Sequence, residues 1–434
     1  MAEAPTASDP PPEFSVGYTR YALGLLVAVY VVNFVDRQIL SILLEAIKQD
    51  LSLSDSQLGL LSGIAFAVLY STLGLPIARW ADRGTRRSII ALALFVWSAM
   101  TGLQGAARNF TWLALARVGV GIGEAGCSPP AHSMISDLFP PSRRATALAI
   151  YSLGIPIGSA IGLIAGGWIR ELFGWRVAFV AVGLPGLLLA LVVRLTLREP
   201  TRGYWDGPAA AREKPESLLQ VAGFLLRLRS FWHLAIAGAL HAFYGYGAGA
   251  FNPAFLERVH GLSPAQVGTG LGLIAASAGG LGTFLGGFFT DRLTRRDERW
   301  SMWLPAGATA LGVPLVSLFY LYPDPLGALI LAALPALVGG MYLGPTFAVT
   351  QALVPARMRA LAAAVLLLIL NLIGLGLGPT FVGVLSDWLV PMYGLESIRY
   401  ALLWTVMAGA SWSTLHYVLA ARTLRTDLRA KDAL

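Results

Sequence analysis

Four ionisable residues lie inside long apolar stretches of this sequence: Asp36, Arg37, Arg117 and Glu124. A charge within a membrane span costs roughly 2.5–3.5 kcal/mol, so such a residue usually has a partner and a function. Burial favours a protonated carboxyl, whereas a nearby guanidinium favours the ionised form. We therefore predict that Asp36 and Glu124 carry protons, with Arg37 and Arg117 as charge partners whose distance changes between states. A static ion network is the alternative, because such clusters also occur without a role in carrying protons.

The spacing of these residues constrains the helices that hold them. Arg117 and Glu124 are two helical turns apart, which places them on one helix face and ~10 Å apart along its axis. Asp36 and Arg37 belong to an earlier segment that runs in the opposite direction, so we expect them at a depth near Arg117. Two acids and two bases then form a neutral cluster between the first and fourth helices.

The sequence contains an internal repeat at an offset of 209 residues, which is described below and divides the chain into two halves. In the second half, Gly245 and Tyr246 occupy the positions that match Asp36 and Arg37, so the matching region has no buried acid. Polar and aromatic residues lie there among glycines. We predict that a substrate cavity is lined by His241, Tyr244, Tyr246, Asn252, Tyr342 and Thr346. Hydrogen-bonding groups in a mostly apolar cavity suit an amphiphile with a polar head and a long tail. For His241, an imidazole satisfied by neighbouring helices is the alternative.

The elements that must position these residues are membrane-spanning helices. The chain has 434 residues, of which 13% are charged and 56% apolar, far from the balance of a soluble enzyme. Apolar segments long enough to cross a ~30 Å hydrocarbon core occur near 20–44, 57–80, 87–106, 110–136, 144–169, 175–197, 231–256, 264–290, 300–322, 326–351, 358–388 and 397–421. We predict an all-α membrane protein with twelve transmembrane helices, because open strand edges are not satisfied in lipid. We find no catalytic triad, metal-ligand spacing or phosphate loop, so we expect no enzyme activity, metal or cofactor.

An internal repeat divides the twelve segments into two halves. Leu-Ser-Asp-Ser-Gln-Leu-Gly at 53–59 recurs as Leu-Ser-Pro-Ala-Gln-Val-Gly at 262–268, and the same offset of 209 relates the basic turns that follow. In both copies the serine and the glutamine have the spacing of a capping box at a helix start. We predict pseudo-symmetric six-helix halves at 1–197 and 231–434, an arrangement in which substrate binds between the repeats.

The segment 198–230 is the predicted linker between the halves. It is polar and rich in proline, and its last part, 217–229, has apolar residues at helical spacing. We expect a short helix on the cytoplasmic surface there. An early start of the seventh span is the alternative.

The repeated basic turns suggest a gate on the cytoplasmic side. An acid just ahead of an Arg-x-x-Arg-Arg run can hold neighbouring helix ends together by charge-assisted hydrogen bonds, and its release would open that side. The predicted gate residues are Asp82, Arg83, Arg86, Arg87, Asp291, Arg292, Arg295 and Arg296. Loops that only determine topology are the alternative.

The distribution of basic residues predicts the orientation. Most of the 32 Lys and Arg residues lie in loops that face the cytoplasm if the N-terminus does. We therefore expect both termini in the cytoplasm and a multi-pass protein of a bacterial inner membrane, active as a monomer among membrane lipids. This topology accounts for the basic pI near 9.7, so nucleic acid is not an expected partner.

Asp-Arg-x-x-Arg-Arg after the second and eighth segments resembles the signature loop of the major facilitator superfamily, although Ala78 and Gly84 depart from its first copy. Within that superfamily, four stretches resemble the spinster-like transporters: 33–37, 117–125, 135–139 and 155–159. Members of that family are associated with proton-linked export of lysolipids and sphingoid-type lipids. The resemblance therefore implies an amphiphilic substrate.

These observations predict a proton-coupled secondary active transporter of a lysolipid or sphingoid amphiphile that works by alternating access. Transport of a small organic anion or drug-like compound is the first alternative, and it would require cavity cations beyond Arg37 and Arg117. A non-transporting sensor is the second, and it would require a partner-binding tail, whereas only about a dozen residues follow Arg422.

Overall fold

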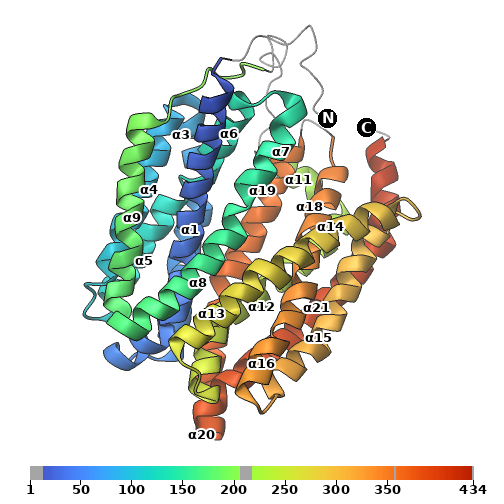
Figure 1. The fold of residues 1–434 in the computed structure, drawn as a ribbon. Coiled ribbons are helices and arrows are strands. Elements are labelled where there is room, and N and C mark those ends of the chain that lie inside the picture. Colours follow the sequence, from blue (N-terminus) through green and yellow to red (C-terminus); the bar gives the residue numbers. More distant parts are fainter. Residues whose placement is uncertain (1–12, 206–217, 356–357, 433–434) are drawn as a thin grey trace.

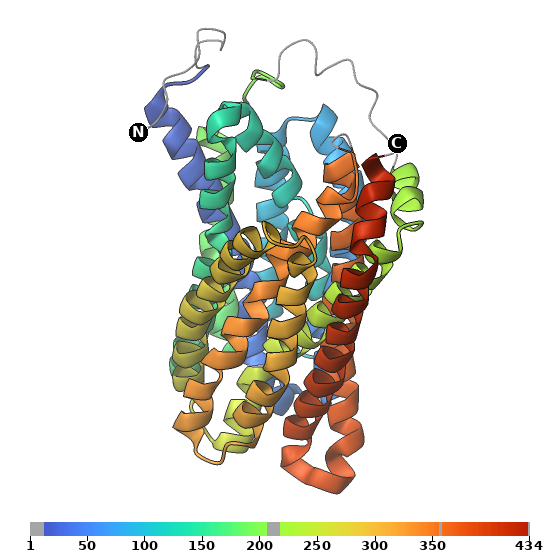
Figure 2. The ribbon, with the colours of Figure 1, turned by 90° about the vertical axis from the view of Figure 1, so that its right-hand side faces the viewer.

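The computed structural model describes residues 13–205, 218–355 and 358–432, and in these ranges the ordered elements are helices. Two bundles lie side by side, with the first half in blue to green and the second in yellow to red (Figure 1). Helix α1 begins and helix α21 ends at the same end of the molecule (Figure 2), which we name the terminal end. The opposite end, where α1 ends at Leu51, is the distal end.

The first half contains the six predicted spans. They are α1 (Val16–Leu51), α2 with α3 (Asp55–Ser62 and Ile64–Arg83), α4 (Arg86–Gln104), α5 with α6 (Phe110–Glu124 and Ser128–Leu138), α7 with α8 (Pro141–Ser152 and Gly154–Phe173), and α9 (Trp175–Thr196). The second span is divided at Gly63, and the fourth is divided after Glu124, just ahead of Pro129 and Pro130. Proline lacks the N–H that an uninterrupted helix needs.

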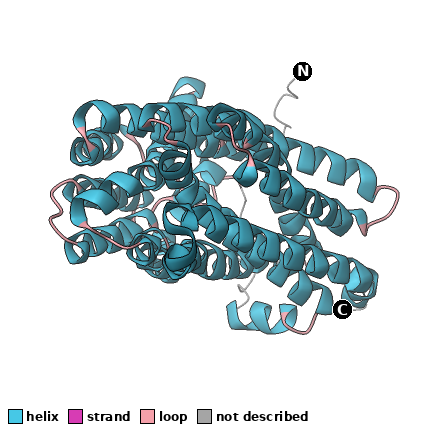
Figure 3. Ribbon diagram, turned by 90° about the horizontal axis from the view of Figure 1, so that it is seen from below, coloured by secondary structure: helices cyan, strands magenta, loops and turns pink. Residues whose placement is uncertain are grey.

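The second half repeats this order. Its spans are α12 (Arg229–His260), α13 with the π-helical η1 and α14 (Pro264–Ile274, Ala275–Gly279 and Gly280–Thr294), α15 (Trp300–Leu321), α16 to α18 with η2 (Pro325–Leu331, Ala333–Gly339, Gly340–Tyr342 and Leu343–Ala352), α19 with the π-helical η4 and α20 (Arg359–Ile369, Leu370–Leu377 and Gly378–Tyr393), and α21 (Ser397–Asp432), which follows η5 (Gly394–Glu396). Seen from below, the described fold consists of helices joined by loops (Figure 3).

The predicted twelve-helix fold is confirmed. In the described ranges, nine helical stretches are long and apolar enough to cross a membrane, and the last of them covers the eleventh and twelfth spans together. The fourth and seventh spans are not among the nine, because the fourth is divided after Glu124 and the seventh is rich in glycine and polar aromatic residues. Both predicted capping boxes are present, at Ser54 with Gln57 and at Ser263 with Gln266.

The linker contains a short helix, α11 (Leu218–Leu225), separated by a turn from α12. Val221 and Leu225 are buried in the core of the second half, while Leu219 is exposed. The rest of the polar segment, 206–217, lies outside the described residues.

Among the described residues, the hydrophobic core joins the halves mainly toward the distal end. One cluster of buried residues there combines α1, α2, α8 and α9 with α12, α15, α20 and α21. Toward the terminal end, a second cluster belongs to the first half apart from Leu375, and a third belongs to the second half. The packing therefore holds the halves together at the distal end and lets each half pack on itself at the terminal end.

Candidate transport site

The predicted charge cluster forms between α1 and α5. Arg37 Nε donates to Glu124 Oε2 at 2.7 Å, and the Glu124 side chain is fully buried. Three aromatic rings surround the Arg37 guanidinium, with Cζ 5.1 Å from the ring centre of Phe34, 5.3 Å from Phe66 and 4.5 Å from Tyr70. These rings stabilise the cation by cation–π attraction.

Asp36 and Arg117 complete the cluster, and neither forms an ion pair with another described residue. Asp36 is 1% exposed, and Trp97 and Thr101 of α4 lie beside its carboxyl without meeting hydrogen-bond geometry. The Arg117 guanidinium lies over Phe66, with Cζ 4.5 Å from the ring centre. The structure thus brings all four predicted residues together, and Arg37 forms its ion pair with Glu124. Arg37 also lies near Arg117, at the depth that the spacing predicted, because both guanidiniums contact the Phe66 ring.

A cavity of about 440 Å³ lies against α12 in the second half. Five of the six predicted cavity residues line it: His241, Tyr244, Tyr246, Asn252 and Tyr342. The sixth, Thr346, is fully buried behind them and bonds to the Tyr417 hydroxyl at 2.9 Å. Most of the remaining lining is alanine, glycine, valine, proline and phenylalanine, so the cavity is largely apolar.

His241 is held by its neighbours and also faces the cavity. Its Nε2 lies 3.1 Å from the carbonyl oxygen of Gly339, which only accepts, so Nε2 carries the proton and Nδ1 accepts from the Tyr244 hydroxyl at 2.7 Å. The Tyr342 ring stacks on the imidazole, with 3.7 Å between ring centres. The alternative in which neighbouring helices satisfy His241 therefore agrees with these contacts, and the ring remains part of the cavity wall.

A smaller hollow of about 100 Å³ lies between residues of the cavity wall and residues of the charge cluster. Arg37 and Arg117 line this hollow, while Gln38, Tyr246 and Gly249 line both spaces. The acid–base cluster of the first half and the apolar cavity of the second half are therefore adjacent parts of one site. Gln38 was missed by the sequence reasoning, although a polar residue directly after Asp36 and Arg37 in an apolar segment was a usable signal.

Comparison with known proteins identifies the architecture. Residues 26–379 match the family model described as Major Facilitator Superfamily. The chain belongs to the Major Facilitator Superfamily. It is thus a multi-pass membrane transporter and not an enzyme.

Relatives of this superfamily member include spinster-like proteins. An MFS-type efflux pump of Mycolicibacterium smegmatis is 37% identical, with 94% of each chain covered. The sphingosine-1-phosphate transporter SPNS2 of Danio rerio is 27% identical, with 87% of this chain and 78% of that protein covered.

 A solved bacterial homologue of the human lysosomal transporter Spinster, in an inward-facing and unoccupied conformation, is 35% identical, with a TM-score of 0.86 and coverage of 95% of this chain and 99% of that one.

In this transporter two of the predicted gate residues of the first half, Arg86 and Arg87, bond to that half and to the start of the linker. Arg86 is fully buried, donates to Asp137, and places Nε 2.7 Å from Glu199 Oε1. The backbone amide of Arg87 also donates to Glu199, at 2.9 Å. Asp82 and Arg83 are exposed, and Asp82 forms no ion pair within the described ranges. The buried arginine, rather than the aspartate, connects the helix ends in this conformation.

The matching turn of the second half is open to solvent. Asp291, Arg292, Arg295 and Arg296 are exposed, and Asp291 has no ion pair among the residues that the structure describes. The ion pairs lie a few residues further on, where Arg425 of α21 contacts Asp297 at 3.0 Å and Glu298 at 3.2 Å. Hydrogen bonds from Arg299 lower the pKa of Asp297 to about 2. The sequence pattern did not single out these residues.

Proposed function

We propose that this protein is a proton-coupled secondary active transporter that moves a lipid-like amphiphile, of lysolipid or sphingoid type, by alternating access. The observation that carries the proposal is the junction at Gln38 and Tyr246, where a buried acid–base cluster adjoins a largely apolar cavity. A relative is named as a sphingosine-1-phosphate transporter, which supports a substrate of this class. We further propose that the terminal end faces the cytoplasm of a bacterial inner membrane and that the transporter works as a monomer with no cofactor but the proton.

The coupling would operate through the ion pair of Arg37 with Glu124. A proton that arrives at Glu124 removes its charge and releases the arginine, which then has Asp36 and the substrate as possible partners. The two protonation states therefore favour different arrangements of α1 and α5, and such a difference in affinity is what shifts a conformational equilibrium.

The cavity chemistry favours an amphiphile over a compact polyanion. Its lining offers hydroxyl, amide and imidazole groups but no cation, and the two arginines lie in the adjoining hollow. One anionic head near the arginines and one apolar tail in the cavity would use both spaces. Transport of a drug-like compound is the second candidate, because a relative with 37% identity is named as an efflux pump.

Reconstitution tests the proposal directly. The purified protein is placed in vesicles with an imposed pH gradient, and the flux of a labelled lysolipid, an organic anion and a lipophilic dye is measured with and without a protonophore. We expect gradient-driven lysolipid flux that the protonophore abolishes. Flux of the anion or the dye without lysolipid flux would reject the lipid assignment, and flux that ignores the gradient would reject proton coupling.

A further inference from the structure

The repeated sequence Leu-Ser-x-x-Gln leaves free backbone donors at the distal end. At the start of α2, the Ser54 hydroxyl accepts the amide of Gln57, and the Gln57 side chain accepts the amide of Ser54. The first-turn amides of Asp55 and Ser56 have no partner inside the helix, because helix starts leave their first amides unpaired. They therefore need an acceptor from elsewhere.

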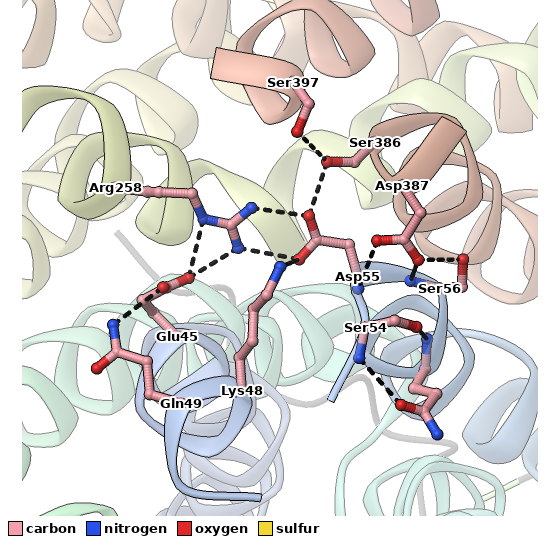
Figure 4. A network of polar contacts seen from close by, with 11 residues as sticks. Glu45, Lys48, Gln49, Ser54, Asp55, Ser56, Arg258, Ser386, Asp387 and Ser397 are labelled. Atoms are coloured by element: carbon pink, nitrogen blue, oxygen red, sulfur yellow. Dashed lines mark hydrogen bonds and ion pairs between the residues drawn. The ribbon is translucent and has the colours of Figure 1, made fainter. Parts of the chain in front are cut away.

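That acceptor comes from the other half of the molecule (Figure 4). Asp387 of α20 accepts the amide of Asp55 on Oδ1 at 3.0 Å. Its Oδ2 accepts the amide of Ser56 at 2.7 Å and also the Ser56 hydroxyl. A carboxylate at a helix N-terminus is favoured by the helix dipole, so α2 is capped across the interface between the halves.

The second copy of the repeat makes the reciprocal contact. Glu171 of α8, in the first half, accepts the Ser263 hydroxyl at 2.7 Å and the amide of Ala265 at 2.9 Å at the start of α13. Pro264 stands where the first copy has Asp55, and proline has no amide to donate. The fifth span thus caps the eighth through Glu171, and the eleventh span caps the second through Asp387. The Glu171 contact has one backbone donor fewer than the Asp387 contact.

Ion pairs between the halves surround these two contacts. Arg258 of α12 donates to Asp55 at 2.7 Å and to Glu45 of α1 at 2.8 Å. Arg170 of α8 makes two bonds of 2.6 Å to Glu257 of α12. Asp55 is fully buried, so opening this end must bring water to a charge that now has only protein partners.

We propose that Asp387 on α2 and Glu171 on α13 are two reciprocal latches that hold the distal end closed, and that both carboxylates must leave their helix starts for that end to open. This inference rests on alternating access in the proposed function. The Asp387 latch is the stronger of the two, because it has three donors and adjoins the buried Arg258 cluster, whereas Glu171 is exposed and has two donors.

Distance measurements between spin labels test the latches without substrate or a proton gradient. Labels are placed at Arg108 in the first half and at Leu395 in the second, which are both exposed at the distal end, in a background with Cys127→Ala. In Asp387→Ala we expect the ratio of open to closed distal distances to rise about tenfold, and in Glu171→Ala about threefold. Ser56→Ala removes only the hydroxyl donor and should give a smaller rise in the same direction, which keeps the test available if Asp387→Ala does not fold.

Two carboxylates of the same end serve as matched controls. Asp324 caps α16 within the second half through the amide of Gly327, at 2.6 Å, and Asp50 pairs with Arg176 within the first half, at 2.6 Å. Asp324→Ala and Asp50→Ala should leave the distances unchanged. The proposal is overturned if Asp387→Ala gives the same distances as Asp324→Ala, and the ranking is overturned if Glu171→Ala has the larger effect. If the variants show the expected distance shifts but the unaltered protein carries no lysolipid flux, the result would instead count against the proposed function.

Discussion

At the scale of single residues, the types and spacing of the charged side chains predicted the cluster well, because a charge within an apolar segment is rare and conspicuous. Asp36, Arg37, Arg117 and Glu124 do meet between α1 and α5. Their pairing was not predictable, since it depends on how far the helices are rotated about their axes. A rotation brings Arg37 onto Glu124 and leaves Arg117 over the ring of Phe66.

The Arg37–Glu124 pair gives the first prediction at this scale. In Glu124→Gln the side chain keeps its shape but neither binds nor releases a proton. We expect gradient-driven accumulation to fall by about tenfold or more, within the usual range of coupling between sites, while exchange of substrate between equal concentrations continues. Flux into vesicles with and without a pH gradient measures both. Glu298→Gln, at an exposed pair with Arg425, is the matched control. Full accumulation in Glu124→Gln would remove Glu124 from the proton pathway.

At the scale of elements, the apolar segments and the capping boxes predicted where helices begin and cross the membrane. The breaks inside the spans were harder to predict from the sequence. The π-helical segments Ala275–Gly279 and Leu370–Leu377 consist mainly of small and apolar residues that fit a regular helix equally well, and tertiary packing selects the wider turn. For example, Gly374 and Gly378 lie against the backbone of α12, where any side chain would collide.

The basic turn between α3 and α4 was also hard to predict in detail, because nothing in the sequence shows which of Arg83 and Arg86 is buried. Arg86 is buried between Asp137 at the end of α6 and Glu199 after α9, whereas Arg83 is exposed. Removal of the buried cation leaves the carboxylates of Asp137 and Glu199 without their shared positive partner. We expect Arg86→Met to lower the free energy of unfolding by about 3 kcal/mol.

The measurement is the thermal unfolding of the purified protein in detergent. Arg83→Met removes the same charge from the same turn and should change the free energy of unfolding by less than about 0.5 kcal/mol. Equal unfolding temperatures for the two variants would show that the Arg86 bonds contribute no net stability.

At the scale of the whole molecule, the offset of 209 residues predicted two halves, but not which end holds them together. That information lies in contacts between residues far apart in the chain, such as Ser56 with Asp387 and Arg170 with Glu257. When each of these residues is considered alone, the sequence around it does not distinguish it from other polar residues at a helix end. The conformation follows from the sum of these contacts and from the shared distal core.

A reversible crosslink across this end gives the last prediction. The side chains of Ser56 and Asp387 are in hydrogen-bond contact, a proximity that suits a disulfide between cysteines at the two positions. In the double variant Ser56→Cys with Asp387→Cys, oxidation should abolish transport in vesicles, and reduction should restore it. Each single variant should be insensitive to the oxidant, because Cys127 is buried. Binding of a substrate from the terminal end should survive oxidation, since the bond holds only the distal end closed. Transport by the fully oxidised double variant would mean that substrate crosses the membrane without separation of α2 from α20.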